Sequence, residues 1–339
     1  VTPARAMHGR CTPVAHQRTL IMMNISNAIS ARGVEEYHEK EYANVEENYY
    51  AKGQPVVTFW HGKLAEKWKL SGKVGDREFR LLARGYDPRT GELLVEAVAG
   101  RRAGVRNAHR AAWDLTLSAP KSVSITAVLG DRPEVYEAHR LAVKEALTAV
   151  EVYATAHLGG TRGKEATGNL VIACFEHDTA RPPTNSPDAR RDVQLHTHAV
   201  AFNMTEASDK VRSLEPRELF RSQKLATAVY RAVLARRLTE AGYTIEIDPK
   251  TGAPEIAGYT KAYLRAASQR SAQIDQNLAA IGLERWARTS KRAARIKRAA
   301  KREVDPVEVR AAQLALAAEF GNQHQAVIAR MLARGRQVL

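Results

Sequence analysis

The clearest strand patterns lie at residues 169–177 (NLVIACFEH) and 194–205 (QLHTHAVAFNMT), where short apolar runs are bounded by polar residues. The segment between them, residues 178–193, contains three prolines and several charges, which predicts a long loop. We therefore expect these two strands to be antiparallel neighbours in one sheet.

A third strand pattern covers residues 112–118, where every second side chain from Trp113 onward is apolar. Pro120 ends this strand. Residues 122–128 then alternate again, which predicts a further strand there.

Elsewhere the apolar positions recur at spacings that are typical of helices. Asp131 is a suitable N-cap and Pro133 suits a first turn, so a helix should begin there and end before Gly159. Including this one, helices are predicted at residues 35–52, 59–70, 133–156 and 216–241 and from residue 261 onward, with a small hairpin within 243–256.

The chain is strongly basic. Its 339 residues include 52 Lys and Arg against 37 Asp and Glu, which leaves a net charge of +15. Such a protein is a candidate for binding a polyanion, most often nucleic acid, although charge can also serve solubility alone. Two cysteines do not make a disulfide framework, which favours a reducing compartment, and no apolar run approaches the length of a membrane span.

The sharpest chemical feature is His196-Thr197-His198 within a predicted strand. Side chains two residues apart on a strand share a face, and His177 ends the neighbouring strand. If the strands pair, three imidazoles converge; imidazole suits Zn, Mn, Fe, Ni or Cu, whereas Mg prefers oxygen. Three protein ligands would leave a position open for water or a phosphate oxygen. The alternative is three half-buried histidines held by hydrogen bonds.

A group of tyrosines at residues 37–50 and the isolated Asp114 help to decide whether the open metal position would hold water or a phosphate oxygen. A phenol becomes a nucleophile once it is deprotonated, which needs a nearby base or cation because its pKa is about 10. Asp114 lies on a strand among uncharged neighbours and is a candidate base. Core packing is the alternative for each tyrosine.

Four segments occur in a recognisable order, namely Tyr37 with Tyr49-Tyr50-Ala-Lys, WDLTLSAPKSVS (113–124), TGNLVIACFEHDTAR (167–181) and QLHTHAVAFNMT (194–205). As a set they resemble the MobF-type relaxase domains of conjugative plasmids, within the HUH endonuclease superfamily. The resemblance covers about residues 23–320, which is nearly the whole chain.

The resemblance implies an α+β fold, with a palm-like antiparallel sheet of about five strands flanked by helices and a helical C-terminal clamp. It implies a metal-dependent enzyme that nicks single-stranded DNA at a plasmid transfer origin through a 5′-phosphotyrosine intermediate and later rejoins the strands. The implied setting is the bacterial cytoplasm, with export alongside the transferred strand. The implied partners are single-stranded origin DNA and the accessory and coupling proteins of conjugation, and the enzyme itself is expected to be a monomer.

Carried over position by position, the resemblance makes His177, His196 and His198 the ligands of a divalent ion, which could be Mg, Mn or Zn. It places Asp114 beside the metal and the tyrosine.

The resemblance aligns Tyr37 with the tyrosine that makes the first cut and Tyr49 with the one that completes transfer. The family usually begins with a tyrosine doublet, whereas His38 follows Tyr37 here and Tyr42 falls within a longer gap. Tyr42 is therefore the rival nucleophile.

Basic residues that flank these strands are candidates for DNA contacts, namely Lys121, Arg181, Arg190 and Arg191. A run at residues 285–302 holds nine Lys and Arg and is either a solvated helix face or a further DNA contact.

The expected domains are a loosely held extension at residues 1–22, a relaxase domain at 23–320 whose helical part begins near residue 261, and a tail at 321–339. The sequence has no GxxxxGK[ST] phosphate loop, so helicase activity is not predicted for this chain.

Three other functions fit parts of the pattern. One is a phosphodiesterase or other hydrolase that uses water on the three histidines, and another is an origin-binding module whose histidines are structural. Neither would form a covalent protein–DNA bond. A rolling-circle replication initiator of the same superfamily would share the chemistry and differ in its substrate.

Overall fold

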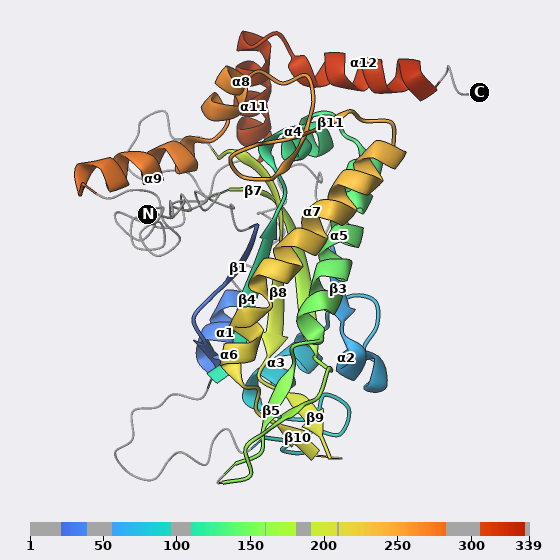
Figure 1. Cartoon of the computed structure of the whole chain (residues 1–339), viewed down its shortest axis with the longest axis vertical. Coiled ribbons are helices and arrows are strands. Elements are labelled where there is room, and N and C mark those ends of the chain that lie inside the picture. Colours follow the sequence, from blue (N-terminus) through green and yellow to red (C-terminus); the bar gives the residue numbers. More distant parts are fainter. Residues whose placement is uncertain are drawn as a thin grey trace, which may run out of the picture.

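The computed structural model describes residues 22–38, 56–95, 110–159, 161–180, 191–208, 210–282 and 306–335. An antiparallel sheet forms the centre of the molecule, with helices on both of its faces (Figure 1). The expected extension therefore lies outside the described residues except for Met22, which is buried.

Within the described residues the central sheet has six strands in the order β1-β4-β8-β7-β3, and β2 also pairs with β4. The strands are β1 (Met23–Ile25), β2 (Ile29–Ser30), β3 (Thr58–His61), β4 (Arg110–Ser118), β7 (Ile172–Thr179) and β8 (Val193–Phe202). Every pairing is antiparallel. The predicted α+β class, the sheet about five strands wide, and the pairing of the two clearest strands are thus confirmed.

Each face of the sheet contributes to a separate hydrophobic core, because side chains on a strand alternate between faces. One core joins the sheet to α5 (Pro133–Glu151) and α7 (Gln223–Glu240), which lie side by side along it (Figure 1). The other core joins the opposite face to α1 (Ala31–Tyr37), α2 (Lys63–Lys67) and α3 (Asp76–Arg84).

Residues 121–129 form helix α4 (Lys121–Leu129), so the strand predicted at 122–128 is wrong. The apparent alternation came from small hydroxyl residues that are buried inside the helix. Ser124 donates its hydroxyl to the carbonyl of Pro120 at 3.0 Å, and Thr126 donates to that of Ser122 at 2.8 Å. These bonds satisfy the hydroxyls within the helix, so the helix can be buried on all sides.

Some predicted helix boundaries also differ. The predicted helix at 59–70 begins with strand β3, and the helix after Pro133 ends at Glu151, before strand β5. Arg132, not Asp131, is its N-cap residue. The helix predicted at 35–52 is described only as far as the end of α1. The smaller elements are β5 (Thr155–His157), β6 (Lys164–Ala166), β9 (Thr205–Ala207), β10 (Lys210–Arg212) and α6 (Pro216–Arg221).

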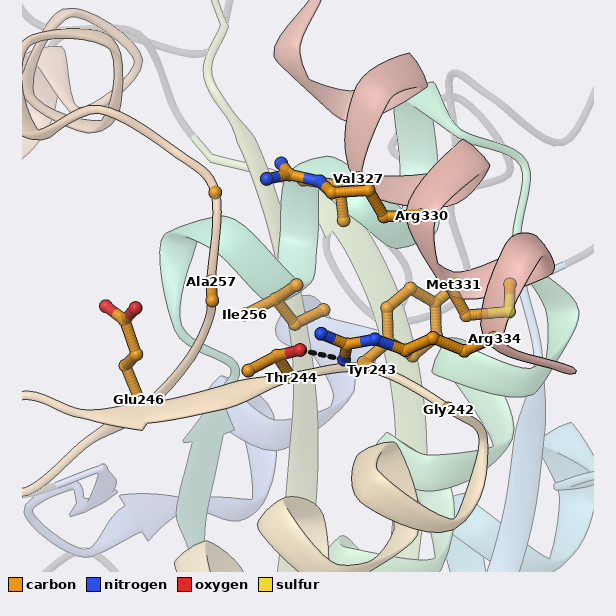
Figure 2. A pocket seen from close by; sticks show the side chains of 11 residues that line it. Gly242, Tyr243, Thr244, Glu246, Ile256, Ala257, Val327, Arg330, Met331 and Arg334 are labelled. Carbon is orange, nitrogen blue, oxygen red and sulfur yellow. Dashed lines mark hydrogen bonds between the residues drawn. The ribbon is translucent and has the colours of Figure 1, made fainter. Parts of the chain in front are cut away.

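The C-terminal part comprises the predicted hairpin, with β11 (Ile245–Ile247) and β12 (Pro254–Ile256), and the helices α8 (Lys261–Ala266), α9 (Gln269–Ala280), α11 (Pro306–Glu319) and α12 (Gln323–Gly335). Residues 323–335 lie within the stretch expected to be a tail and form α12, in line with the helices predicted from residue 261 onward, and Val327 and Met331 of α12 are buried in the core. A pocket of about 370 Å³ lies between α12 and the hairpin, where Arg334 donates a hydrogen bond to Thr244 (Figure 2).

None of the helices within the described ranges is both long and apolar enough to cross a membrane.

Candidate active site

The three histidines singled out from the sequence meet on one face of the sheet. His177 on β7 is the direct partner of His196 on β8, and His198 lies two residues further along β8 opposite Phe175. Their ring centres are 5.4 Å apart for His177–His196, 5.4 Å for His177–His198 and 5.1 Å for His196–His198. The predicted convergence of the imidazoles is therefore confirmed.

The donor set fits a metal ion. Two imidazoles bound to one ion at about 2.1 Å have ring centres about 5 Å apart. The Nδ1 atom of His196 donates to the carbonyl of Gln194 at 2.8 Å, and that of His198 donates to Asp114 Oδ2 at 2.8 Å. A carbonyl and a carboxylate only accept, so both neutral rings keep the lone pair on Nε2, the atom that would bind a metal.

The side chains are close together without forming a finished coordination shell. Among the described residues, no group of three or more His, Cys, Asp or Glu is arranged to hold a metal ion as it stands. The strand positions nevertheless bring the three ring centres to 5.1–5.4 Å from one another, which is the spacing expected of imidazoles on one ion.

Asp114 on β4 fixes the orientation of His198. Its side chain is buried, and its Oδ2 also accepts from the hydroxyl of Thr116 at 3.4 Å. Its other oxygen, Oδ1, is buried and makes no hydrogen bond to any described residue. Asp114 therefore combines a hydrogen bond to a candidate ligand with an oxygen that can accept a proton.

Helix α1 ends on the same face of the sheet as the histidines. It begins at the N-cap Ser30, and Glu35 ties it to Arg84 of α3 through an ion pair at 2.5 Å. The residue after the helix, His38, is stacked on Phe79 at 4.2 Å and meets the edge of Phe175 at 5.6 Å. Since Phe175 is the strand partner of His198, the end of α1 lies beside the triad.

This arrangement brings the backbone of Tyr37, the last residue of α1, to the side of the sheet that carries the triad. The side chain of Tyr37 and the whole of Tyr42 and Tyr49 lie outside the described residues, so their predicted roles stay predictions.

The two described candidates for DNA contacts have partners within the protein. Lys121 donates from Nζ to the carbonyl of Val193 at 2.6 Å, which ties α4 to the start of β8. Arg191 is only 6% exposed, and its carbonyl accepts from Gln313 of α11. Their predicted contacts with DNA stay predictions. Arg181, Arg190 and the basic run at 285–302 lie outside the described residues.

Sequence reasoning missed a set of buried polar residues on the opposite face, directly behind the triad. His139 and Arg140 of α5 contact Thr197 and Glu176 there. Burial lowers the pKa of His139 to about 3 and raises that of Glu176. The available signal was a histidine on the apolar stripe of a predicted helix, but spacing alone does not identify its partner.

The TrwC relaxase family matches residues 31–320 of the chain. The multifunctional conjugation protein TraI of Escherichia coli is 34% identical over 283 residues, which cover 80% of this chain, and TraI of strain K12 is 33% identical over 296 residues, which cover 84%. In both cases the match spans 15% of the length of the TraI protein.

Solved structures with a similar fold include the conjugative relaxase TrwC in complex with oriT DNA in a metal-bound form, with a TM-score of 0.73 and 32% identity. A copper-bound TrwC–oriT complex has a TM-score of 0.73 and 33% identity. TrwC with a 27-mer DNA that comprises the recognition hairpin and the cleavage site has a TM-score of 0.71 and 33% identity. Each covers 88% of this chain and 99% of the other.

Proposed function

Since this chain belongs to the TrwC relaxase family, we propose that it is a strand-specific nickase and transesterase that acts on single-stranded DNA at a plasmid transfer origin. The observation that carries the proposal is the histidine triad beside the end of α1, on one face of the sheet in a chain of net charge +15.

In this proposal the phenol oxygen of Tyr37 attacks the scissile phosphate. The new bond joins Tyr37 to the 5′ phosphate, and the bond that breaks releases a free 3′ hydroxyl. Because one phosphodiester replaces another, the reverse attack by a 3′ hydroxyl can rejoin strands without a nucleotide. Tyr49 performs the second transfer, and Tyr42 is the alternative to Tyr37 for the first.

His177, His196 and His198 would hold a divalent ion, with Mg, Mn or Zn as the candidates. When bound, such an ion supplies positive charge that neutralises the phosphate oxygens and orients the scissile bond. Structures of the relaxase TrwC with oriT DNA include a metal-bound and a copper-bound form, which supports a metal site here without identifying its ion.

Asp114 has two roles in the proposed reaction. Its Oδ2 keeps Nε2 of His198 free of the proton, through the hydrogen bond at 2.8 Å. Its Oδ1 is buried and makes no hydrogen bond within the described residues, so it can accept the phenol proton as the nucleophile attacks.

The DNA strand would approach the triad near the start of β8. The C-terminal helices contact this point, since Gln313 of α11 bonds the carbonyl of Arg191 and the amide of Arg270 on α9 donates to Asp192 at 3.4 Å. This placement supports a clamp formed by the part of the chain after residue 261. The proposed DNA contacts are Lys121, Arg181, Arg190 and Arg191. Arg191 is buried, so its contact with DNA would require the C-terminal helices to move away from the start of β8.

The proposed setting follows from the same function. The relaxase unit would span residues 23–320 and act as a monomer in the bacterial cytoplasm. Its proposed partners are origin DNA and the accessory and coupling proteins of conjugation, with export alongside the transferred strand.

The direct test is incubation with single-stranded oligonucleotides that span candidate origins, in the presence of Mn²⁺, followed by a denaturing gel. We expect a covalent protein–DNA adduct that chelator and His196→Ala both abolish. Cleavage without any adduct would instead identify a hydrolase that uses water. Binding that survives the chelator without cleavage would identify a non-catalytic module.

A further inference from the structure

A polar layer lies behind the histidine triad, on the face of the sheet that otherwise packs an apolar core against α5 and α7. The strand pair Glu176–Thr197 is its centre. This pair lies between the pair His177–His196 and the pair Phe175–His198, so it separates the positions that carry the three imidazoles. Its side chains point away from the triad, because neighbouring residues on a strand face opposite sides.

On the β8 side of this pair, a chain of hydrogen bonds reaches from Thr197 to both long helices. The hydroxyl of Thr197 is 2.9 Å from Nε2 of His139 on α5, and Nδ1 of His139 is 2.7 Å from the hydroxyl of Tyr230 on α7. Thr197 is 1% exposed, and His139 and Tyr230 are 0% exposed. The chain therefore lies entirely inside the protein.

On the β7 side, the next residue of α5 makes a similar connection. Arg140 donates from Nε to Glu176 at 2.9 Å and from Nη2 at 2.7 Å, which is a two-pronged ion pair. Consecutive residues of α5 thus hold the two strands that carry the triad at the same level of the sheet. Glu176 immediately precedes His177, and Thr197 lies between His196 and His198.

Stability alone does not account for this layer. Polar and charged groups are costly to bury, and buried ion pairs can often be replaced by apolar side chains of similar volume without loss of stability. Hydrogen bonds have specific lengths and directions, however, so a fully bonded network restrains the positions of the elements that it joins more closely than apolar packing does. At this point of the sheet, the restrained elements are the strand segments of the triad.

We propose that His139 and Arg140 are positioning residues, which hold Thr197 and Glu176 so that His177, His196 and His198 stand at the spacing required to bind a divalent cation together. This inference rests on the proposed metal-binding role of the triad. Residues of α5 and α7 would thereby raise the affinity of the triad for a cation, although neither helix contributes a side chain to the triad.

The test uses Thr197, because two substitutions separate its hydroxyl from its shape. Thr197→Val keeps the branched side chain and removes the hydrogen bond to His139, whereas Thr197→Ser keeps the hydroxyl and removes a methyl group. We expect the affinity of the full chain for Mn²⁺, measured by calorimetry, to fall about 10-fold in Thr197→Val, the lower end of the range for residues that support metal ligands. Thr197→Ser should bind Mn²⁺ like the wild type.

Thr227→Val is the matched control. Thr227 is a buried threonine of α7 whose hydroxyl accepts from the amide of Met23 at 3.4 Å, away from the triad. This variant should lose stability and keep its Mn²⁺ affinity. If Thr197→Val fails to fold, Tyr230→Phe removes the other end of the chain of bonds and should weaken Mn²⁺ binding in the same direction.

The outcomes separate the two proposals. Wild-type affinity in both Thr197→Val and Tyr230→Phe, with binding lost in His196→Ala, would overturn the positioning role of His139 and leave the metal-binding role of the triad intact. Equal Mn²⁺ binding by His196→Ala and the wild type would overturn the metal-binding role of the triad itself.

Discussion

At the residue scale, the carboxylate of Asp114 connects orientation and proton transfer. One oxygen accepts the Nδ1 proton of His198, and the other is buried without a hydrogen bond to any described residue. The choice of acid matters, because a carboxylate both increases the basicity of the imidazole and can take up a proton, whereas an amide of the same shape does neither well.

Asp114→Asn tests this double role. We expect Mn²⁺ affinity to fall by about 10-fold or more, because His198 loses its charged partner. We also expect the nicking rate to stay below that of the wild type at saturating Mn²⁺, because the proton acceptor is lost. Asp87→Asn is the control and should keep the Mn²⁺ affinity and nicking rate of the wild type. Asp87 is also buried, but it is ion-paired with Arg89 in the loop after α3. Nicking at the wild-type rate in Asp114→Asn at saturating metal would exclude Asp114 as the proton acceptor.

We expect His139 to make the stability of the protein depend on pH. Burial lowers its pKa from 6.5 to about 3, with Arg140 adding to the effect, and its hydrogen-bond partners Tyr230 and Thr197 are uncharged. Between those values the unfolded chain binds a proton that the folded chain excludes. The free energy of unfolding therefore falls as the pH is lowered through this window, by at most about 1.4 kcal/mol per pH unit for this group.

Urea unfolding at pH 7.5 and pH 5.5 measures this contribution. The loss of stability between the two values should be smaller in His139→Gln than in the wild type by about 1 kcal/mol, because Gln does not titrate. The same pH dependence in both proteins would show that His139 does not contribute.

At the element scale, helix α4 follows the strand that carries Asp114 and is held by a carboxylate from the C-terminal hairpin. Glu255 of β12 accepts from the amide of Ser122 at 3.2 Å and from its hydroxyl. A negative charge at this end of a helix also interacts favourably with the helix dipole. The hairpin therefore stabilises the start of α4.

Glu255→Ala should lower the free energy of unfolding by about 1–3 kcal/mol, because it leaves a buried hydroxyl and a helix-terminal amide without this acceptor. Glu246→Ala, at an exposed position of the neighbouring strand β11, should change it by less than about 0.5 kcal/mol. Equal unfolding midpoints in urea for the two variants would contradict the capping role.

The triad could be located from the sequence because strand geometry leaves little freedom. Once His196 and His198 are on one strand, they share a face, and pairing with β7 brings His177 to the same level. Helix α4 could not be recognised in this way, because its buried Ser and Thr residues alternate with apolar residues as in a strand. The hydroxyls of Ser124 and Thr126 bond to carbonyls four residues earlier, which makes this pattern compatible with a helix. The network behind the triad also escaped prediction, since the contact between His139 and Thr197 joins residues 58 positions apart.

At the scale of the whole molecule, the charge of +15 predicts how DNA binding responds to salt. Each phosphate that the protein neutralises releases counterions, so affinity should fall as salt rises. We expect the affinity for a 25-nucleotide origin strand to fall by about 10-fold or more between 50 and 200 mM NaCl. Fluorescence anisotropy measures this, and an affinity independent of salt would show that binding does not depend on the basic surface.

The central claim joins the two halves of the site, namely that a tyrosine next to the histidine triad forms a covalent bond to DNA. Mass spectrometry of the peptide that remains attached to a cleaved origin oligonucleotide tests it most directly. The account predicts a nucleotide-bearing peptide with the modification on Tyr37, and modification of Tyr42 would move the first cut to that residue. Cleaved DNA without any linked peptide, or a link outside residues 37–50, would contradict the account.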